Sequence, residues 1–149
     1  MEPDPSGSIL TSIGLVAGLI ILGALFVAAE IALISLRESQ IKQLAGRGKR
    51  GARVAAVASN PNRLLAALQV GVTVTGFLSA ALGAEKLGAY VIPWLEDIGL
   101  SPKSAGTTSL IGVTLIIAYF SLVFGELVPK RIALYRAEEI ALEIGRAHV

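Results

Sequence analysis

Three long runs without a charged residue limit what this chain can fold into more than any other feature of its sequence. They cover residues 9–29, 64–84 and 104–125. Each run matches the roughly 20 apolar residues that cross the hydrocarbon core of a bilayer as a helix. Charged residues make up only 16% of the 149 positions, which leaves too little polar surface to cover three such helices in water. We therefore predict an all-α membrane protein with three transmembrane helices, in preference to a soluble domain with buried core helices.

We expect a single transmembrane domain over residues 1–149. Its spans are predicted at about 9–36, 64–87 and 104–128, with a basic juxtamembrane segment at 37–60.

Basic residues are distributed unevenly between the two connections. The first connection carries one acidic residue, Glu38, and the seven basic residues Arg37, Lys42, Arg47, Lys49, Arg50, Arg53 and Arg63. The second carries two basic and three acidic residues. Because Lys and Arg near span ends stay on the cytoplasmic side, we predict a multi-pass protein of the cell membrane with its N-terminus outside and its C-terminus inside. The basic connection is expected to contact anionic lipids, not nucleic acid.

The juxtamembrane segment is expected to be helical. Apolar and basic residues alternate between 38 and 59, as in an amphipathic helix on the cytoplasmic membrane surface. Gly46, Gly48 and Gly51 are expected to interrupt this helix, and a solvated basic loop remains an open alternative for the glycine-rich middle.

Two Xaa-Pro pairs predict helix starts. Asn60 and Ser101 are suited to cap a helix, and each is followed by a proline that suits the first helical position. Between these points, Trp94 is expected at the outer membrane interface.

The segment FGELVPK at 124–130 places a carboxylate at the end of the third run, directly before a helix breaker. Pro129 has no amide hydrogen, so in a helix the carbonyl of Gly125 loses its usual partner beside Glu126. Hard cations such as Mg²⁺ and Na⁺ prefer such oxygens. The pattern predicts a cation site with a local break in the helix. Pairing of Glu126 with Lys130 near the interface is the alternative.

Polar residues also occur in the other two spans. Glu30 follows the first uncharged run, and either a buried functional role or a snorkelling interfacial position fits it. In the second span, Gln69 and Thr73 recur at helical spacing, with Thr75 and Ser79 on an adjacent strip. These residues suit oxygen ligands, and they suit helix packing equally well.

Gly14 and Gly18 form a small-xxx-small pattern in the first span. Such spacing permits close helix contact, either within one subunit or between two.

Three blocks of sequence together resemble the transmembrane domain of the CNNM/CorC family. They are FVAAEIALISLR at 26–37, RLLAALQVGVT at 63–73 and FGELVPK at 124–130. The last block is specific in that position, whereas the first two would be weak alone. The resemblance covers nearly the whole chain and implies a homodimer with three spans and a juxtamembrane belt in each subunit.

The resemblance implies a divalent-cation transporter, not an enzyme, that exports Mg²⁺ coupled to inward Na⁺. In the family, polar groups from all three spans hold a dehydrated Mg²⁺, and the family's Gly-Glu pair corresponds to Gly125 and Glu126. Two other family ligand positions hold Val27 and Val72 here, so those ligands cannot be carried over. The expected metal ligands are therefore Glu126, Gly125, Glu30, Thr73, Gln69 and Thr75. The expected gating or structural residues are Pro129, Lys130, Gly71, Ser35 and Ser79.

Family members usually continue into cytoplasmic paired CBS domains and a small C-terminal domain. We expect the present sequence to be the excised membrane domain of such a protein. A membrane anchor and dimerisation module that transports nothing is one alternative, and an exporter of Co²⁺ or Mn²⁺ is another. The sequence has no Cys, and its one His, His148, lies in the tail. This favours a hard, oxygen-binding ion without separating Mg²⁺ from Mn²⁺.

Overall fold

The computed structural model describes residues 5–136, and within them every regular element is a helix. Three stretches are long and apolar enough to cross a membrane, as predicted: Gly7–Ile34, Asn62–Lys86 and Pro102–Tyr135. The first lies in α1 (Pro5–Ile34), and the second is α4 (Asn62–Lys86). The third combines α6 (Pro102–Leu122), the turn η1 (Val123–Leu127) and α7 (Val128–Tyr135). The protein is therefore a multi-pass membrane protein.

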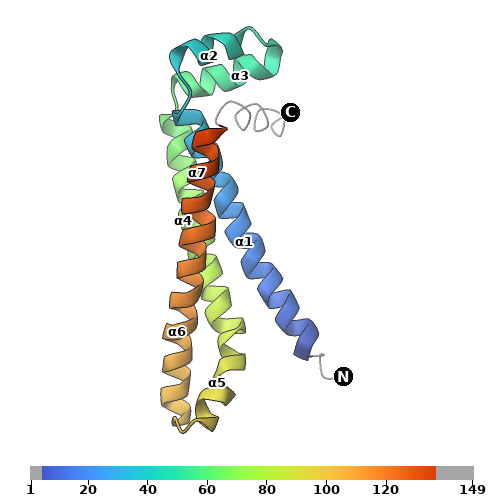
Figure 1. Ribbon diagram of the computed structural model, residues 1–149, viewed down its shortest axis with the longest axis vertical. Helices are drawn as coiled ribbons and strands as arrows, with labels where there is room; N and C mark the ends of the chain where they lie inside the picture. The colour runs from blue at the N-terminus through green and yellow to red at the C-terminus, as the bar shows by residue number, and fades with distance from the viewer. Residues whose placement is uncertain (1–4, 137–149) are drawn as a thin grey trace.

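The three long helices form an elongated bundle (Figure 1). The run of α6 and α7 lies beside α4, and α1 packs on α4, η1 and α7. Toward its N-terminus α1 leans away from the other two long helices (Figure 1). The connections lie at opposite ends of the bundle, with α5 (Gly88–Asp97) at one end and α2 (Glu38–Ala45) and α3 (Gly48–Ser59) at the other.

The helices α2 and α3 pack against each other as a hairpin, called here the basic hairpin. The expected interruption occurs at Gly46 to Gly48, where Gly48 has a φ of +83° that favours glycine. The prediction for Gly51 was wrong, because Gly51 lies inside α3 and is buried. A Cβ atom there would overlap the carbonyl oxygen of Leu44 on α2. Glycine at 51 therefore permits the two helices to touch.

The main cluster of buried apolar side chains lies where the basic hairpin meets the bundle. It consists of Ala32, Leu33, Leu36, Leu44, Val54 and Ala55. Leu64 and Leu68 of α4 pack against it from the side. The first span, the hairpin and the start of the second span thus share one core, which we call the junction core.

The two Xaa-Pro pairs behave differently. Ser101 caps α6 as predicted, because its side chain accepts a hydrogen bond from the Ser104 N–H at 3.3 Å. The predicted cap at Asn60 was wrong. Asn60 closes α3 instead, with its N–H donating to the Val57 carbonyl at 3.2 Å, and α4 begins at Asn62 after Pro61.

Sequence analysis did not anticipate α5, which contains Pro93 and Trp94. This helix packs on α6, where the buried Ser109 hydroxyl donates to the Gly88 carbonyl at 2.7 Å. The second connection is therefore a structured part of the fold. Trp94 is exposed at this end of the bundle.

Small residues of α1 fall into two groups. Gly23 is packed on α4, since a Cβ atom there would lie 2.9 Å from Thr75 Oγ1. A Cβ atom at Gly14 or Gly18 would meet no atom within 4 Å. Within the described residues, the Gly14 and Gly18 face thus makes no close helix contact inside the subunit.

Candidate cation site

A groove between α4 and α6 contains the Glu126 side chain. Its volume is about 540 Å³. From α4 it is lined by Thr73, Gly76 and apolar neighbours, and from the third helix by Thr114, Ser121 and Glu126. Among the described residues that line the groove, only Glu126 has an ionisable side chain. The groove lining therefore contains one carboxylate and three hydroxyl groups, and its remaining described side chains are apolar.

The third helix is not broken before Pro129, as the sequence had suggested. It widens instead into the π-helical turn η1, in which the Val128 N–H donates to the Val123 carbonyl five residues back. The chain then continues as α7, with Pro129 in its first turn, where proline is tolerated. The helix thus absorbs the proline without ending.

The π turn also affects where Glu126 points. In a regular α-helix Glu126, twelve residues after Thr114, would point about 120° away from it. A π turn holds one residue more than an α turn, so it sets the following residues back by up to about 100°. This rotation brings Glu126 toward the face that carries Thr114 and Ser121, and all three line the groove. Such turns are frequent at functional sites.

Gly125 occupies the other side of the π turn. It is buried against α1, and a Cβ atom there would lie 3.7 Å from the Ile20 carbonyl oxygen. Its own carbonyl cannot receive the usual hydrogen bond, because Pro129 has no N–H. Gly125 and Glu126 thus belong to one turn, but only Glu126 lines the groove with α4.

Thr73 is oriented in a way that suits a cation. Its hydroxyl donates to the Gln69 carbonyl at 2.9 Å, so the hydroxyl hydrogen is already used. The oxygen lone pairs remain for an acceptor role, which a metal ion can satisfy.

The polar residues of α4 divide between two faces. Thr73 faces the groove, and Gln69 lies one turn before it, exposed, outside the described lining. Thr75 and Ser79 are buried, and their hydroxyls donate to the carbonyls of Gly71 and Thr75, at 2.9 and 2.8 Å. Thr75 lies against Gly23 of α1, which places it away from the groove.

The remaining candidates lie apart from the groove lining. Glu30 is half-buried on α1, and Ser35 is half-buried directly after the end of α1. Gly71 packs under Phe26, whose ring would lie 2.9 Å from a Cβ atom at this position. Lys130 is half-buried on α7, and no ion pair joins it to Glu126 in the described structure. His148 lies outside the described residues.

The groove alone offers an incomplete metal shell. Between residues 5 and 136, no three His, Cys, Asp or Glu side chains gather where they could hold a metal ion. Mg²⁺ demands six oxygen ligands in octahedral geometry but readily keeps water among them. One carboxylate, a hydroxyl of the groove lining and water could hold such an ion.

Sequence analysis did not single out Thr114 and Ser121. They are seven residues apart, which places them on one helix face. The spacing could have identified Thr114 and Ser121 as one polar face. It could not have shown that Glu126 shares this face, because that depends on the π turn.

A second cavity, of about 450 Å³, lies between α1 and α6. Its described lining, which includes Ile13, Ile20, Ile117 and Phe124, is entirely apolar. This cavity offers no side-chain ligand for a cation.

The fold and the groove define a class: a three-span membrane protein in which a residue of a π turn contributes a carboxylate to a groove between two spans. Residues 14–147 match the cyclin M transmembrane N-terminal domain, and the chain belongs to this CNNM family. The family resemblance drawn from the sequence is therefore confirmed.

Relatives of the chain are found among bacterial proteins. It is 42% identical over 130 residues to the UPF0053 protein sll0260 of Synechocystis, covering 87% of this chain and 29% of the relative. It is 34% identical to the UPF0053 protein YhdP of Bacillus subtilis, covering 86% and 29%. It is 30% identical to a protein named polyamine export protein of Haemophilus influenzae, covering 87% and 30%. The chain thus spans about three tenths of the length of these relatives.

Proposed function

We propose that this chain is the membrane domain of a cation transporter that exports Mg²⁺ in exchange for inward Na⁺. In this proposal it binds and moves an ion and catalyses no covalent reaction. The observation that carries the proposal is the position of Glu126, on a π turn, in a groove that also contains Thr73, Thr114 and Ser121. An ionisable residue inside a membrane span is costly, so it commonly marks an ion pathway.

Mg²⁺ would enter from the end of the bundle that carries the basic hairpin, which we take to be cytoplasmic. Glu126, the Gly125 carbonyl and the Thr73 hydroxyl are the proposed ligands, with water in the remaining positions. A relative movement of the spans would then expose the ion to the outer side. Glu30, half-buried on α1, is proposed to bind Na⁺ or to gate this movement.

Several parts of this proposal concern the assembly. The groove is open along one side, and a three-span chain has little material to enclose an ion path, so we propose a homodimer. The basic hairpin would lie on the cytoplasmic membrane surface and contact anionic lipids. In the whole protein, CBS domains would follow on the same side.

The test is calorimetric titration of the purified protein with Mg²⁺, with and without Na⁺, for the parent and Glu126→Gln. We expect saturable binding that Na⁺ weakens and that Glu126→Gln removes while helicity is retained. The matched control is Glu85→Gln, an exposed carboxylate at the far end of α4. Unchanged affinity in Glu126→Gln would refute the assignment of the site.

A second test separates the two acidic residues. If Glu30 binds Na⁺, Glu30→Gln will abolish the Na⁺ dependence of Mg²⁺ flux in proteoliposomes and preserve Mg²⁺ binding. Flux identical to that of the parent would remove Glu30 from the mechanism.

Export of an organic polycation is the second candidate, because one relative carries the name polyamine export protein. A single carboxylate in a long, mostly apolar groove would suit an amine group attached to methylene chains. Titration with spermidine in place of Mg²⁺ distinguishes the two. Spermidine binding that Glu126→Gln removes, without Mg²⁺ binding in the parent, would favour this candidate. Binding of neither, in a folded dimer, would favour a non-transporting anchor.

A further inference from the structure

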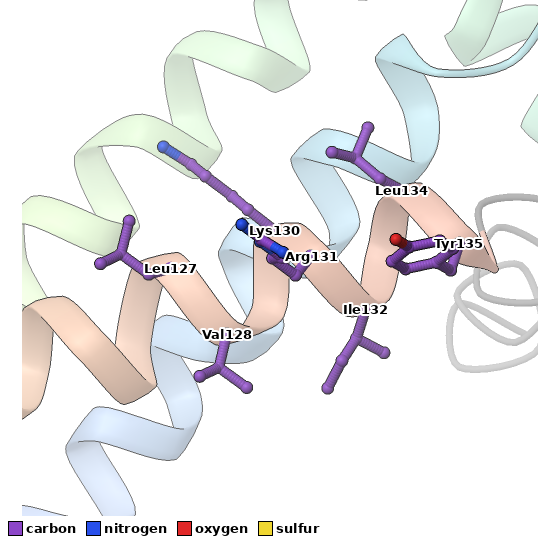
Figure 2. A pocket seen from close by; sticks show the side chains of 7 residues that line it. All are labelled: Leu127, Val128, Lys130, Arg131, Ile132, Leu134 and Tyr135. Atoms are coloured by element: carbon purple, nitrogen blue, oxygen red, sulfur yellow. The ribbon is translucent and has the colours of Figure 1, made fainter.

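The end of the third helix carries a second surface with charged side chains. It is distinct from the groove that contains Glu126. It lies along α7 and forms an open cavity of about 710 Å³. Figure 2 shows the described side chains that line it, all of them from α7 and the last residue of η1.

The packing of α7 explains why this surface is open. Pro129 and Ala133, four residues apart, are the residues of α7 that are buried, and α7 packs on α1. Leu127, Ile132 and Leu134 are each more than half exposed, and Tyr135 is 85% exposed. In water such an apolar surface would be unfavourable, so this part of α7 belongs next to lipid or protein.

The same surface carries two cationic groups. Lys130 and Arg131 line the cavity, and neither forms an ion pair with a described residue. No carboxylate is found in the described lining. Figure 2 shows Val128 and Ile132 pointing to one side of the helix, with Lys130 and Arg131 pointing elsewhere. Leu127 precedes Lys130 and Arg131 by three and four residues, which places its apolar side chain beside both cationic groups on the helix.

The level of these groups in the membrane follows from the chain. The third uncharged run ends at Gly125, so Lys130 and Arg131 lie roughly 8 to 9 Å further along the helix at 1.5 Å per residue. That distance places them at the headgroup level of the leaflet on the side of the basic hairpin. Tyr135 lies at the same interface, where aromatic residues with a polar group are favoured.

We infer that α7 holds an anionic phospholipid of that leaflet. Its phosphate would contact Lys130 and Arg131, and an acyl chain would lie along Leu127, one turn closer to the membrane core. A zwitterionic lipid offers the same acyl chains but carries no net charge to match two cations. This site is separate from the basic hairpin and does not depend on which substrate the protein carries.

The test uses tryptophan fluorescence, because the chain contains a single tryptophan, Trp94, on the opposite end of the bundle. In a Trp94→Phe background, Tyr135→Trp places the reporter on the exposed face of α7. The reporter protein is reconstituted into nanodiscs of phosphatidylcholine that contain either brominated phosphatidylglycerol or brominated phosphatidylcholine. Quenching against the mole fraction of brominated lipid gives the relative affinity of the two headgroups.

We expect phosphatidylglycerol to be preferred, with each basic side chain near the surface contributing about fivefold. Arg131→Gln should reduce the preference by about fivefold, and Lys130→Gln with Arg131→Gln should bring it close to one. The matched control is Lys49→Gln with Arg50→Gln, an adjacent Lys-Arg pair on the exposed face of α3, which should leave the preference unchanged.

Three results would overturn the inference. Equal quenching by both lipids in the reporter protein would show no anionic site. A loss of preference in the Lys49→Gln and Arg50→Gln variant, equal to that in the α7 variant, would assign the effect to the basic hairpin. Quenching by neither lipid would mean that protein, such as a second copy, covers α7.

Discussion

Gly51 of α3 lies directly against the backbone of Leu44 of α2, with no room for a Cβ atom between them. The obstacle is a carbonyl oxygen, which cannot rotate out of the way as the end of a side chain can. Close contact of α2 and α3 therefore depends on the absence of a side chain at one position. Leu44 is itself fully buried in the junction core, so this contact links the hairpin to the bundle.

Replacing Gly51 by Ala should separate α2 from α3 and destabilise the basic hairpin by about 1–3 kcal/mol, the usual cost of overpacking. Trypsin provides the measurement, because the hairpin is rich in Lys and Arg, and cleavage there should become faster. Gly46→Ala is the control, since its Cβ would lie 3.5 Å from the Gln43 carbonyl oxygen, an ordinary contact. Equal cleavage rates in both variants would contradict this account of the hairpin.

Thr73→Val should weaken Mg²⁺ binding about tenfold or more, the effect expected when a charged group loses one polar contact. The fold should persist, because Thr73 is exposed and Val has nearly the same shape. Calorimetric titration measures the change. Thr107→Val is the matched control: Thr107 is also exposed, and its hydroxyl donates to the Lys103 carbonyl four residues back in the same way. An equal effect of the two substitutions would remove Thr73 from the site.

Gly23→Ala should lower the stability of the bundle by about 1–3 kcal/mol, because the added methyl group would press on Thr75 Oγ1. Gly14→Ala, on the open part of the same helix, should have little effect on the isolated subunit. Thermal unfolding in detergent at a concentration that keeps the protein monomeric compares the two. Greater destabilisation by Gly14→Ala would show that the face of Gly14 is packed within the subunit.

Ser109→Ala should loosen α5 from α6 by removing the hydrogen bond from its hydroxyl to the Gly88 carbonyl. The expected cost is about 0.6 kcal/mol, the average for hydrogen bonds between membrane helices, and at most about 1.7 kcal/mol. Hydrogen exchange at the amides of α5 should rise, while exchange in α3 stays the same. Thr108→Ala, an exposed neighbour, serves as control. Unchanged hydrogen exchange in α5 would mean that the hydrogen bond from Ser109 to Gly88 does not hold α5 on α6.

The three spans were predictable because an uncharged run of about 20 residues has few other stable environments. Helix α5 was missed because it is short and contains Pro93, which sequence reasoning treats as a stop signal. Gly51 was misjudged for a related reason. A glycine that interrupts a helix and a glycine that lets two helices touch look the same until the partner helix is placed.

The candidate site was predictable only in part. Glu126 was found because a carboxylate beside a proline inside a span is unusual. Thr114 and Ser121 were missed because they share a face with Glu126 only after the π turn has rotated the helix. The sequence predicted that Pro129 would disturb the helix, but it did not show that a wider turn, instead of a break, would accommodate it. Thr75 was predicted to be a ligand together with Thr73, but it packs against Gly23 of α1. The sequence of α4 alone does not show which of its faces a neighbouring helix will cover.

The position of the junction core has a consequence for how this chain folds. Lipid tails are as apolar as Leu, so burying apolar side chains between helices inside a bilayer gains little, whereas at the aqueous surface water drives the same burial. The junction core joins the basic hairpin, whose charges keep it out of the hydrocarbon, to the ends of α1 and α4. Entry of the spans into the bilayer and closure of this core are therefore separable steps. Urea, which acts from the aqueous phase, should reverse the second step, so that the basic hairpin separates from the ends of α1 and α4 while the three spans stay inserted.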